Sequence, residues 1–313
     1  MSARTGAAVG GFRVGHGSCI RHHGEFLQGC FWDAASGTHV PGLVTVPVPE
    51  LRTHAIFRPA DGDGIHVPGD RPKSARAAAL ALEACRDRGG NHPAGGVVEI
   101  SGHDDRGWGM GSSTSDVIAT VRAVCAGCGV TLSRWEISDV AVRAEAASDP
   151  LAYDETPVLF AQRHARLLRR WSRPFPPVAL VGCRLPGEPV DTLAIELEPY
   201  TPSEQREFAR LGGLLNAAVV RADPRLLGRV ATRSAEIHQR RVHRPGLDHV
   251  VEICRAVGGV GVQIAHSGTV CGVLLDEREP DVARKISRTR AALSRAGFTP
   301  TLEKRSESHR VPL

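Results

Sequence analysis

Residues 107–114 are Gly107-Trp108-Gly109-Met110-Gly111-Ser112-Ser113-Thr114, a glycine-rich turn that runs directly into the start of a predicted helix. Alternating glycines let the backbone bend sharply and bring its N–H groups close to an anion. The unpaired amides in the first turn of a helix, together with the helix dipole, favour negative charge at the same place. The stretch therefore predicts a loop that holds phosphate groups, and a plain structural turn is the alternative interpretation.

Other phosphate-binding patterns do not describe this loop. The chain contains no G-x-x-x-x-G-K-[ST], and the spacing of the loop misses the third glycine of G-x-G-x-x-G. The adjacent Ser112 and Ser113 favour phosphate binding over a plain turn, because a single serine would suffice to cap the helix. A second hydroxyl there can bind Mg²⁺ beside the phosphates of a nucleotide.

Helical and strand-like patterns surround the loop on both sides. Helices are expected where apolar residues recur at helical spacing, at residues 71–88, 112–128, 133–147, 203–222, 224–240 and 245–257. Ser112 or Ser113 is expected to cap the second of them. Strands are expected at residues 96–101, 178–183, 260–265 and 270–276, and as a strand, a turn and a strand over residues 42–57. Clustered helices and mostly antiparallel strand pairs indicate an α+β fold.

The length of the chain predicts more than one folding unit. A chain of 313 residues is long enough for two lobes that face a cleft, since single cores usually stop growing below this size. Pro174, Pro176 and Pro177 interrupt a helical pattern just before an apolar strand and mark the boundary. We expect a loose tail at residues 1–12, an N-terminal lobe at residues 13–173 and a C-terminal lobe at residues 174–313.

The composition is that of an ordinary globular protein, with 42% hydrophobic and 23% charged residues and no apolar run of membrane-spanning length. The start of the chain lacks a secretory signal, and eight cysteines at scattered spacing fit reduced thiols in a cytoplasmic protein. The net charge of +5 could attract nucleic acid, but aromatic residues are few and acids are interspersed. We therefore expect no nucleic-acid or membrane partner, and a homodimer is compatible with the sequence.

Three segments carry a family resemblance. Gly-Met-Gly-Ser-Ser-Thr-Ser-Asp at 109–116 resembles the second motif of the GHMP kinase superfamily. Gly-Glu-Phe-Leu-Gln-Gly at 24–29 and Val-Gly-Val-Gln-Ile-Ala-His-Ser-Gly-Thr-Val at 260–270 resemble the first and third motifs of its L-threonine kinases, the type found in cobalamin biosynthesis and propanediol utilisation. Weaker matches at Asp116, residues 148–149, 159–160 and 190–192 extend the resemblance over roughly residues 15–275. It implies an N-terminal lobe like ribosomal protein S5 domain 2 and a ferredoxin-like C-terminal lobe.

The resemblance also implies roles for individual residues. The phosphates of ATP would lie against the glycine loop, at Gly107, Gly109, Met110, Gly111, Ser112, Ser113 and Thr114. The acceptor would lie against the other two motifs, at Glu25, Gln28, His266, Ser267, Gly268 and Thr269. Ser112 or Ser113 would bind Mg²⁺, and we take Ser113 as the catalytic residue of the two. Glu145 is the available carboxylate for a second metal ligand, although the family pattern would place that acid one residue later.

Asp149 is the catalytic carboxylate that the resemblance implies. An alcohol is a poor nucleophile at neutral pH, and a carboxylate within hydrogen-bond reach can align it and take its proton. Phosphoryl transfer depends mostly on positioning and charge neutralisation, so Asp149 is either the base or a residue that only orients the hydroxyl. A helix-ending turn at Asp149-Pro150 is the structural alternative.

The sequence departs from the subfamily's pattern at three places near the presumed site. Trp108 stands where a lysine is usual, which leaves Arg106 as the nearest replacement cation. His23 replaces a small residue or a cysteine. Ala146 stands where an acid is expected, and the available carboxylate of Glu145 is shifted by one residue. Such changes are typical of a paralogue with another hydroxy amino acid as substrate, and they also fit a weak or lost activity.

The sequence therefore predicts an ATP- and Mg²⁺-dependent kinase that phosphorylates the side-chain hydroxyl of L-threonine or a related hydroxy amino acid. Within the superfamily, homoserine, mevalonate or sugar kinase activity is the alternative. From another class, the chain could be a nucleotide-binding regulatory protein with a degenerate site, and a nucleic-acid-binding module is the third interpretation.

Overall fold

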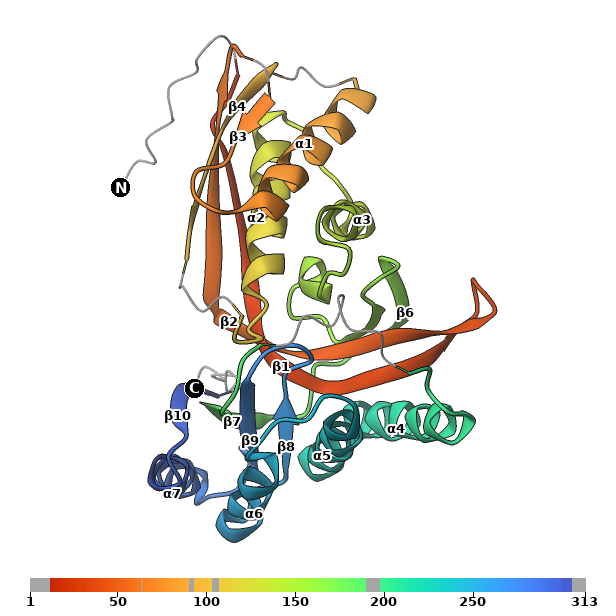
Figure 1. Cartoon of the computed structure of the whole chain (residues 1–313), viewed down its shortest axis with the longest axis vertical. Helices are drawn as coiled ribbons and strands as arrows, with labels where there is room; N and C mark the ends of the chain where they lie inside the picture. Colours follow the sequence, from red (N-terminus) through yellow and green to blue (C-terminus); the bar gives the residue numbers. More distant parts are fainter. Residues whose placement is uncertain (1–11, 63, 90–92, 103–106, 190–197, 306–313) are drawn as a thin grey trace, which may run out of the picture.

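The computed structural model describes residues 12–62, 64–89, 93–102, 107–189 and 198–305. Within these residues, ten strands form one curled sheet, and seven α-helices pack against it (Figure 1). Along its main path the strand order is β10-β7-β9-β8-β1-β2-β4-β3. The paired strands are antiparallel except for β3 and β4, which confirms the predicted α+β class.

The longest elements are β1 (Gly15–Asp33) and β2 (Thr38–Ala60), which form a hairpin through the middle of the molecule (Figure 1). The expected turn within residues 42–57 is wrong, because β2 is continuous there. The register shifts between the pair Arg21–Val48 and the pair Ile20–Arg52. Pro49 lies in this irregularity, and a bulge accommodates proline because the ring nitrogen has no hydrogen to donate to the ladder.

Three helices and two strands complete the half of the molecule drawn at the top of Figure 1. They are α1 (Pro72–Asp87), α2 (Ser112–Gly127), α3 (Arg134–Glu145), β3 (Gly64–His66) and β4 (Gly95–Ser101). The predicted start of α3 is confirmed by a capping box, in which the Ser133 hydroxyl accepts from Glu136 N and the Glu136 carboxylate accepts from Ser133 N. The helix ends two residues earlier than predicted, because Ala146 adopts a left-handed φ of 67°.

Helix α2 is the central helix of this half, and its buried residues lie on nearly all of its sides. It approaches β1 closely because two glycines of the strand face it. A Cβ atom at Gly17 would lie 2.1 Å from the carbonyl oxygen of Ala119, and one at Gly15 would lie 1.9 Å from that of Ala123. The backbones are thus in contact, and the position of the glycine loop before α2 depends on this packing.

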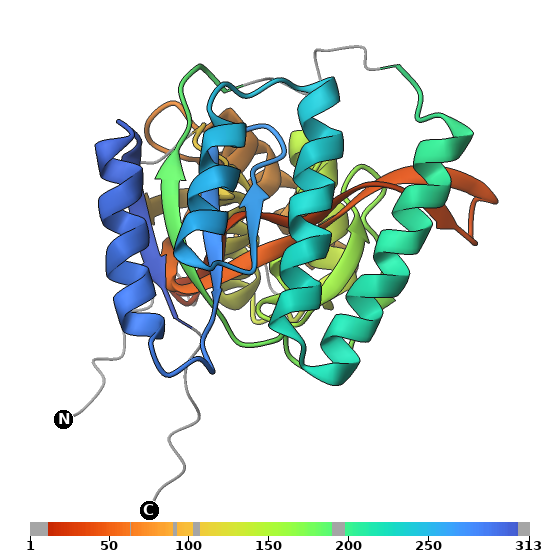
Figure 2. The same cartoon turned by 90° about the horizontal axis from the view of Figure 1, so that it is seen from below.

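The other half is built from four strands and four helices. They are β7 (Val178–Arg184), β8 (Gly261–Ile264), β9 (Val270–Asp276), β10 (Thr299–Lys304), α4 (Pro202–Arg221), α5 (Pro224–Arg241), α6 (Leu247–Val257) and α7 (Val282–Arg295). The four helices form a layer over one face of the strands (Figure 2). The sequence predicted α4, α5 and α6 with β7, β8 and β9, but it did not predict α7 or β10.

A single-turn 3₁₀ helix, η1 (Pro150–Tyr153), and the hairpin of β5 (Val158–Ala161) and β6 (Arg166–Arg170) connect the two halves along the chain. The halves also share the β1–β2 hairpin. Cys19 and Ile20 pack with α1, α2 and α3, whereas Phe26 and Phe31 pack with α4 and α5. One hairpin therefore contributes to both hydrophobic cores, and the lobe boundary near residue 173 stays a prediction.

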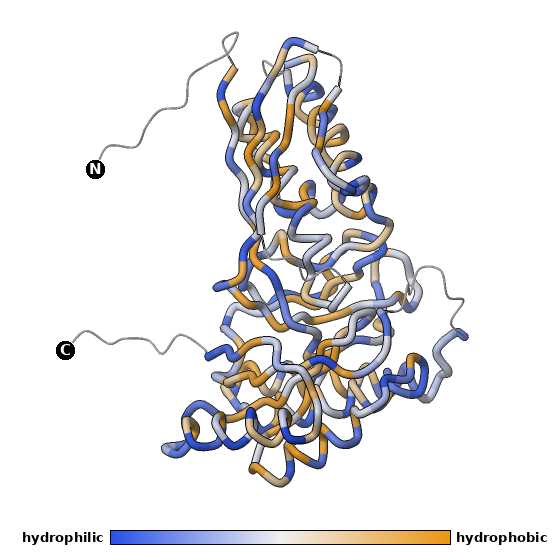
Figure 3. Tube along the Cα trace, turned by 60° about the vertical axis from the view of Figure 1, so that its left-hand side comes forward, coloured by the Kyte–Doolittle hydropathy of each residue, from blue (hydrophilic) through white to orange (hydrophobic). Residues whose placement is uncertain are grey.

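Hydropathy follows this arrangement of the backbone. Figure 3 shows hydrophobic residues along the inner strands and hydrophilic residues gathered on the outer helices and loops. Among the helices that the structure describes, none has an apolar run long enough to cross a lipid bilayer.

We predict that Gly17→Ala lowers the free energy of unfolding by roughly 1–3 kcal/mol, because its methyl group would push α2 away from β1. Gly213→Ala is the matched control: no atom lies within 4 Å of its Cβ position in α4. This change should raise the free energy of unfolding by about 0.5–1 kcal/mol, because alanine favours a helix. Urea denaturation measures both, and equal effects of the two changes would contradict the packing argument.

Candidate active site

The glycine loop has a backbone that only glycine adopts readily. Gly107, Gly109 and Gly111 have φ values of 82°, 88° and 66°, all in the left-handed region. The expectation that Ser112 or Ser113 caps α2 is wrong, because Gly111 is the N-cap residue and no side chain caps the helix. Both serines therefore lie in the first helical turn, where their hydroxyls and the unpaired amides are at the positive end of the helix dipole.

The loop is held from two sides by backbone hydrogen bonds. The carbonyls of Gly109 and Met110 accept from Gly24 N and His22 N of β1, both at 3.3 Å. The carbonyl of Trp108 accepts from Thr269 N and Val270 N at 2.9 Å. A Cβ atom at Gly268 would lie 2.2 Å from Gly109 N. The loop of the third motif (residues 265–269, the third-motif loop) therefore packs directly on the glycine loop (residues 107–111). The structure thus brings all three sequence motifs together.

Two hydroxyls at the start of α2 converge on one buried carboxylate. Glu145, at the end of α3, accepts hydrogen bonds from Ser113 Oγ at 3.0 Å and Thr114 Oγ1 at 2.7 Å. Burial raises the pKa of Glu145 to about 7, against the lowering effect of these hydroxyls and of Lys73. The Lys73 ammonium lies 4.0 Å from the carboxylate and is half exposed. Serine hydroxyl and carboxylate oxygens are the hard ligands that Mg²⁺ prefers, so this pair fits a magnesium ion.

A second cluster joins two carboxylates through a histidine. His22 Nε2 lies 3.0 Å from Asp149 Oδ2, and His22 Nδ1 lies 4.0 Å from Glu25 Oε1 and 3.3 Å from the carbonyl oxygen of Gly24. The imidazole also packs under the glycine loop, since a Cβ atom at Gly111 would lie 2.3 Å from it. Asp149 N lies 3.4 Å from Thr114 Oγ1, which connects this cluster to Glu145.

The pKa values of the cluster are shifted by burial and by the charges of its members. Burial alone would lower the pKa of His22, but the charge and hydrogen bond of Asp149 and the charge of Glu25 raise it to about 9. Burial would raise the pKa of Asp149, yet His22 holds it below its usual value. Burial raises the pKa of Glu25 to about 8. At neutral pH the cluster thus contains an imidazolium, an ionised Asp149 and a Glu25 that retains its proton.

A chain of polar contacts continues from Glu25 along β1. Gln28 Nε2 donates to the carbonyl of Ile264 at 3.2 Å, and Gln28 Oε1 lies 2.8 Å from His266 Nδ1. The carbonyl of His266 lies 2.9 Å from His238 Nε2. Burial lowers the pKa of His266 to about 4, so its ring is neutral and can donate its Nδ1 hydrogen to Gln28. Gln28 and His266 therefore form a fixed wall beside the two carboxylates.

Several predicted site residues contribute to the site through packing or through backbone contacts. Met110 is buried in a small apolar cluster with Ala265 and Val270. Thr269 is fully buried, and its backbone joins the third-motif loop to Trp108 and Leu185. Ser267 offers its carbonyl to the Arg244 guanidinium at 2.6 Å. These residues shape the backbone of the two loops.

The position of His23 differs from the expectation that it lies near the acceptor. Side chains alternate along a strand, so His23 points away from His22. Its Nε2 lies 2.8 Å from Thr301 Oγ1, and its Nδ1 lies 2.6 Å from Gln263 Nε2. It therefore binds β10 to the sheet. Two other residues named from the sequence, Arg106 and Asp191, lie outside the described residues.

Three functional candidates were missed in the sequence. His22 carries no signal beyond its place beside the first motif. Lys73 was included only in a predicted helix. Arg184 ends β7, and its guanidinium lies 4.5 Å from the centre of the Trp108 ring and 3.5 Å from Thr269 Oγ1. Lys73 and Arg184 thus supply cations near the loop, although Trp108 replaces the usual lysine.

An anion cradle, two oxygen ligands for a metal and an ionised carboxylate within one site are the groups that phosphoryl transfer requires. Comparison of the sequence with models of known protein families gives two matches. Residues 74–159 match the GHMP kinases N terminal domain, and residues 215–292 match the GHMP kinases C terminal model. The chain belongs to the GHMP kinase family, and solved structures of this family share its fold.

Individual relatives are distant. The chain is 27% identical over 191 residues to an L-threonine kinase of Salmonella typhimurium, over 56% of this chain and 58% of that protein. It thus spans less than two thirds of the length of this curated relative. Among solved structures, a homoserine kinase from Cytophaga hutchinsonii gives a TM-score of 0.64 at 16% identity, over 93% of this chain and 96% of the other. Streptococcus pneumoniae phosphomevalonate kinase in complex with phosphomevalonate and AMPPNP gives 0.69 at 14% identity, over 94% and 99%.

We predict that the free energy of unfolding falls as the pH rises from about 6.5 to 9. The pKa of His22 rises from 6.5 to about 9 on folding, and that of Glu25 rises from 4.5 to about 8. The folded protein therefore holds these protons more tightly than the unfolded chain, and this stabilisation is lost as they dissociate. Urea denaturation across this range should show a loss of at least roughly 1 kcal/mol, since one pKa unit corresponds to about 1.4 kcal/mol.

Glu25→Gln tests the assignment, because it removes one of the two titrating groups. The fall in stability over the same pH range should become shallower in this variant. An unchanged pH dependence would show that Glu25 titrates at its ordinary pKa.

Proposed function

We propose that this chain is an ATP- and Mg²⁺-dependent kinase that transfers the γ-phosphoryl group of ATP to the side-chain hydroxyl of L-threonine or a related hydroxy amino acid. One observation carries the proposal. The ionised Asp149, paired with His22 at 3.0 Å, is joined through Thr114 to the Ser113–Glu145 pair at the mouth of the glycine loop. A base for an alcohol and ligands for a nucleotide-bound metal are thus adjacent.

The glycine loop is the proposed phosphate site. Gly107, Gly109 and Gly111 would let backbone amides approach the phosphate oxygens, and the first turn of α2 would add the amides of Ser112, Ser113 and Thr114. Lys73 and Arg184 would neutralise the negative charge of the phosphates. They would replace the lysine that is usual at position 108. Neutralisation by positioned cations is the main source of rate acceleration in phosphoryl transfer.

Ser113 and Glu145 would hold the magnesium ion. Glu145 stands one residue before the position that the family pattern suggests, but both of its carboxylate oxygens face the hydroxyls of α2. Burial raises the pKa of Glu145, and a cation bound beside it would favour the ionised form. When bound, Mg²⁺ would neutralise charge on the β- and γ-phosphates.

Glu25 and Gln28, with His266, would line the acceptor side. Glu25 is buried, and its Oε2 has no hydrogen-bond partner among the described residues. An amino-acid substrate carries an ammonium group, which would pair with this carboxylate and favour its ionised form. A mevalonate or sugar acceptor has no such cation. The unpartnered oxygen therefore supports an amino acid over the other alcohols.

The proposed reaction uses Asp149 as the proton acceptor. The hydroxyl oxygen of the substrate attacks the γ-phosphorus while its proton passes to the Asp149 carboxylate. The bond between the γ-phosphorus and the β–γ bridging oxygen breaks, and ADP leaves with that electron pair. His22 keeps Asp149 ionised and fixes its orientation, which a general base requires.

Two rivals remain to be separated by experiment. Homoserine is itself a hydroxy amino acid, and a homoserine kinase is among the structural neighbours, so this acceptor is the second candidate. A nucleotide-binding regulatory protein with a degenerate site would bind ATP without turnover. The intact contacts of Asp149 and Glu145 support an active enzyme over this rival.

The experiment is a panel of acceptors with ATP and Mg²⁺. We predict that purified protein converts L-threonine or a related hydroxy amino acid to a product one phosphoryl group heavier by mass spectrometry, with stoichiometric ADP. Mevalonate and galactose should give a kcat/KM lower by at least about tenfold, which corresponds to 1.4 kcal/mol of transition-state stabilisation. Binding of AMPPNP by calorimetry without product from any acceptor would establish the regulatory rival.

We further predict that Asp149→Asn lowers kcat by roughly 10²–10⁴-fold with little change in the KM for ATP, as expected for loss of a general base. Asp139→Asn, an ion-paired surface carboxylate on α3, is the matched control and should be neutral. A loss of only a few fold in Asp149→Asn would assign Asp149 to orientation of the hydroxyl instead of proton transfer.

A further inference from the structure

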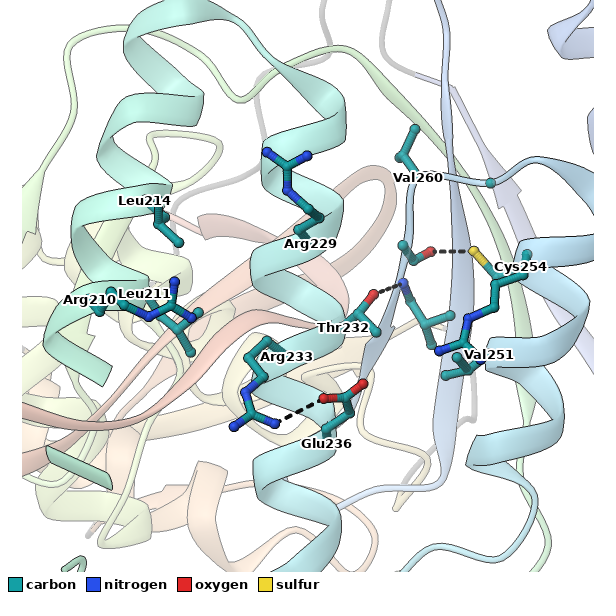
Figure 4. A pocket seen from close by; sticks show the side chains of 14 residues that line it. Arg210, Leu211, Leu214, Arg229, Thr232, Arg233, Glu236, Val251, Cys254 and Val260 are labelled. Carbon is teal, nitrogen blue, oxygen red and sulfur yellow. Dashed lines mark hydrogen bonds and ion pairs between the residues drawn. The ribbon is translucent and has the colours of Figure 1, made fainter. Parts of the chain in front are cut away.

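A cavity of about 410 Å³ lies in the helical layer, and its lining includes none of the candidate active-site residues. Its walls come from α4, α5 and α6, and the strand β8 with the turn before it forms the remaining side (Figure 4). The volume is within the range of small-molecule sites in proteins, roughly 300–1,000 Å³.

The charged lining of this cavity is mostly basic. Four arginines contribute to it, against a single acid, Glu236. They are Arg210, Arg229, Arg233 and Arg255. A cluster of guanidinium groups in one concave site is typical of recognition of phosphate or carboxylate groups, because the planar fork donates two parallel hydrogen bonds to such anions.

The counter-charges in the structure neutralise only part of this cluster. Glu207 pairs with Arg210 at 2.8 Å and with Arg233 at 3.0 Å, and Glu236 pairs with Arg233 at 3.1 Å. Arg229 and Arg255 have no ion pair with any carboxylate in the part of the chain that the structure describes. Two positive charges therefore remain available at the cavity.

Arg229 lies at a position on α5 where an unpaired positive charge is unfavourable. Arg225, Arg229 and Arg233 follow one another at four-residue spacing along α5, so they lie on the same side of the helix. The first is paired with Glu279 and the last with Glu207, but the central one has no described carboxylate. Like charges at this spacing destabilise a helix, and an anion bound at Arg229 would relieve the repulsion.

The rest of the lining is apolar. Leu211 and Leu214 come from α4 and Val251 comes from α6, and Val260 and Val262 belong to the side formed by β8. Inorganic phosphate would leave this surface in contact with water. A ligand that joins an anionic group to an apolar body would use both parts of the site.

We propose that this cavity is a binding site for a small organic phosphate monoester. Its phosphate group would pair with Arg229 and Arg255, whose two free charges match the charge of nearly two that a phosphate monoester carries at neutral pH. Its apolar body would pack against Leu214 and Val251. The site is independent of the proposed kinase reaction and does not require it.

The wall formed by α5 is shared with the candidate active site. Thr232 Oγ1 accepts from Val262 N at 2.9 Å inside the cavity wall. Two residues further along, Ser234 Oγ accepts from Gln28 N at 2.9 Å, and His238 lies 2.9 Å from the carbonyl of His266. The same helix thus borders the cavity and supports the acceptor side of the kinase site.

The test uses phenyl phosphate as the probe and isothermal titration calorimetry of the full chain, with saturating AMPPNP and Mg²⁺ present to fill the nucleotide site. We expect saturable binding at one site, and phenol, which has the same ring without the charge, should bind at least about tenfold more weakly. Inorganic phosphate should also bind more weakly, because it makes no apolar contact. Since charge-assisted hydrogen bonds are lost, Arg229→Ala/Arg255→Ala should weaken phenyl phosphate binding by about tenfold or more.

Arg206→Ala/Arg288→Ala is the matched control, since it removes two exposed arginines outside the cavity and changes the net charge equally. Phenyl phosphate should bind this variant as it binds the unmodified chain. Equal binding to all three proteins, equal loss in both double variants, or no binding to the unmodified chain would each overturn the proposal. Circular dichroism melting of the variants checks that both remain folded, which is expected because all four side chains are exposed.

Discussion

The whole site depends on the contact of the glycine loop with two other backbones. Amides of β1 donate to the carbonyls of Gly109 and Met110, and the amides that follow Gly268 donate to the carbonyl of Trp108. No side chain fits between these segments, because a Cβ atom at Gly109 would lie 2.4 Å from that of Ala265. The loop before α2 is thus fixed between the two halves of the molecule, and a backbone that is already in place would lose little entropy on binding an anion.

The electrostatics of the site follow from the burial that this packing causes. His22 is covered by Gly111 and flanked by Asp149 and Glu25, so the three groups share one cation between two carboxylates. Burial makes a second ionised carboxylate costly there and raises the pKa of Glu25, and the charge of Asp149 adds to this rise while His22 opposes it. The arrangement favours the ionised form of Asp149 and the protonated form of Glu25.

Local patterns predicted much of this structure. Helices α1 to α6 and strands β7, β8 and β9 follow from apolar spacing, capping residues and prolines, all of which act over a few residues. The turn in residues 42–57 was wrong because two prolines there can mark either a turn or a bulge, and only the pairing with β1 decides between them. The cap of α2 was wrong because a serine was expected where a left-handed glycine suffices.

The candidate site was partly predictable for the same reason. The three motifs bring Glu25, Ser113 and His266 into consideration without a structure. The roles of His22, Lys73 and Arg184 depend on contacts between distant segments, and no local pattern reports them. His23 was instead placed near the site by its sequence position and does not lie there. His22 faces the site, and because side chains alternate along a strand, His23 points toward Thr301.

The route of β1 through both cores has a consequence for synthesis of the chain on the ribosome. The contacts around Ile20 are made with residues up to about position 152, so this part of the molecule can fold while the chain is still growing. Glu25 and Gln28 instead contact Ile264 and His266, and His23 contacts Thr301, so these contacts form only after the later segments have been synthesised. The contacts of the glycine loop with β1 can therefore form early, whereas its contacts with Thr269 and Val270, and those of Glu25 and Gln28, form only when most of the polypeptide has emerged.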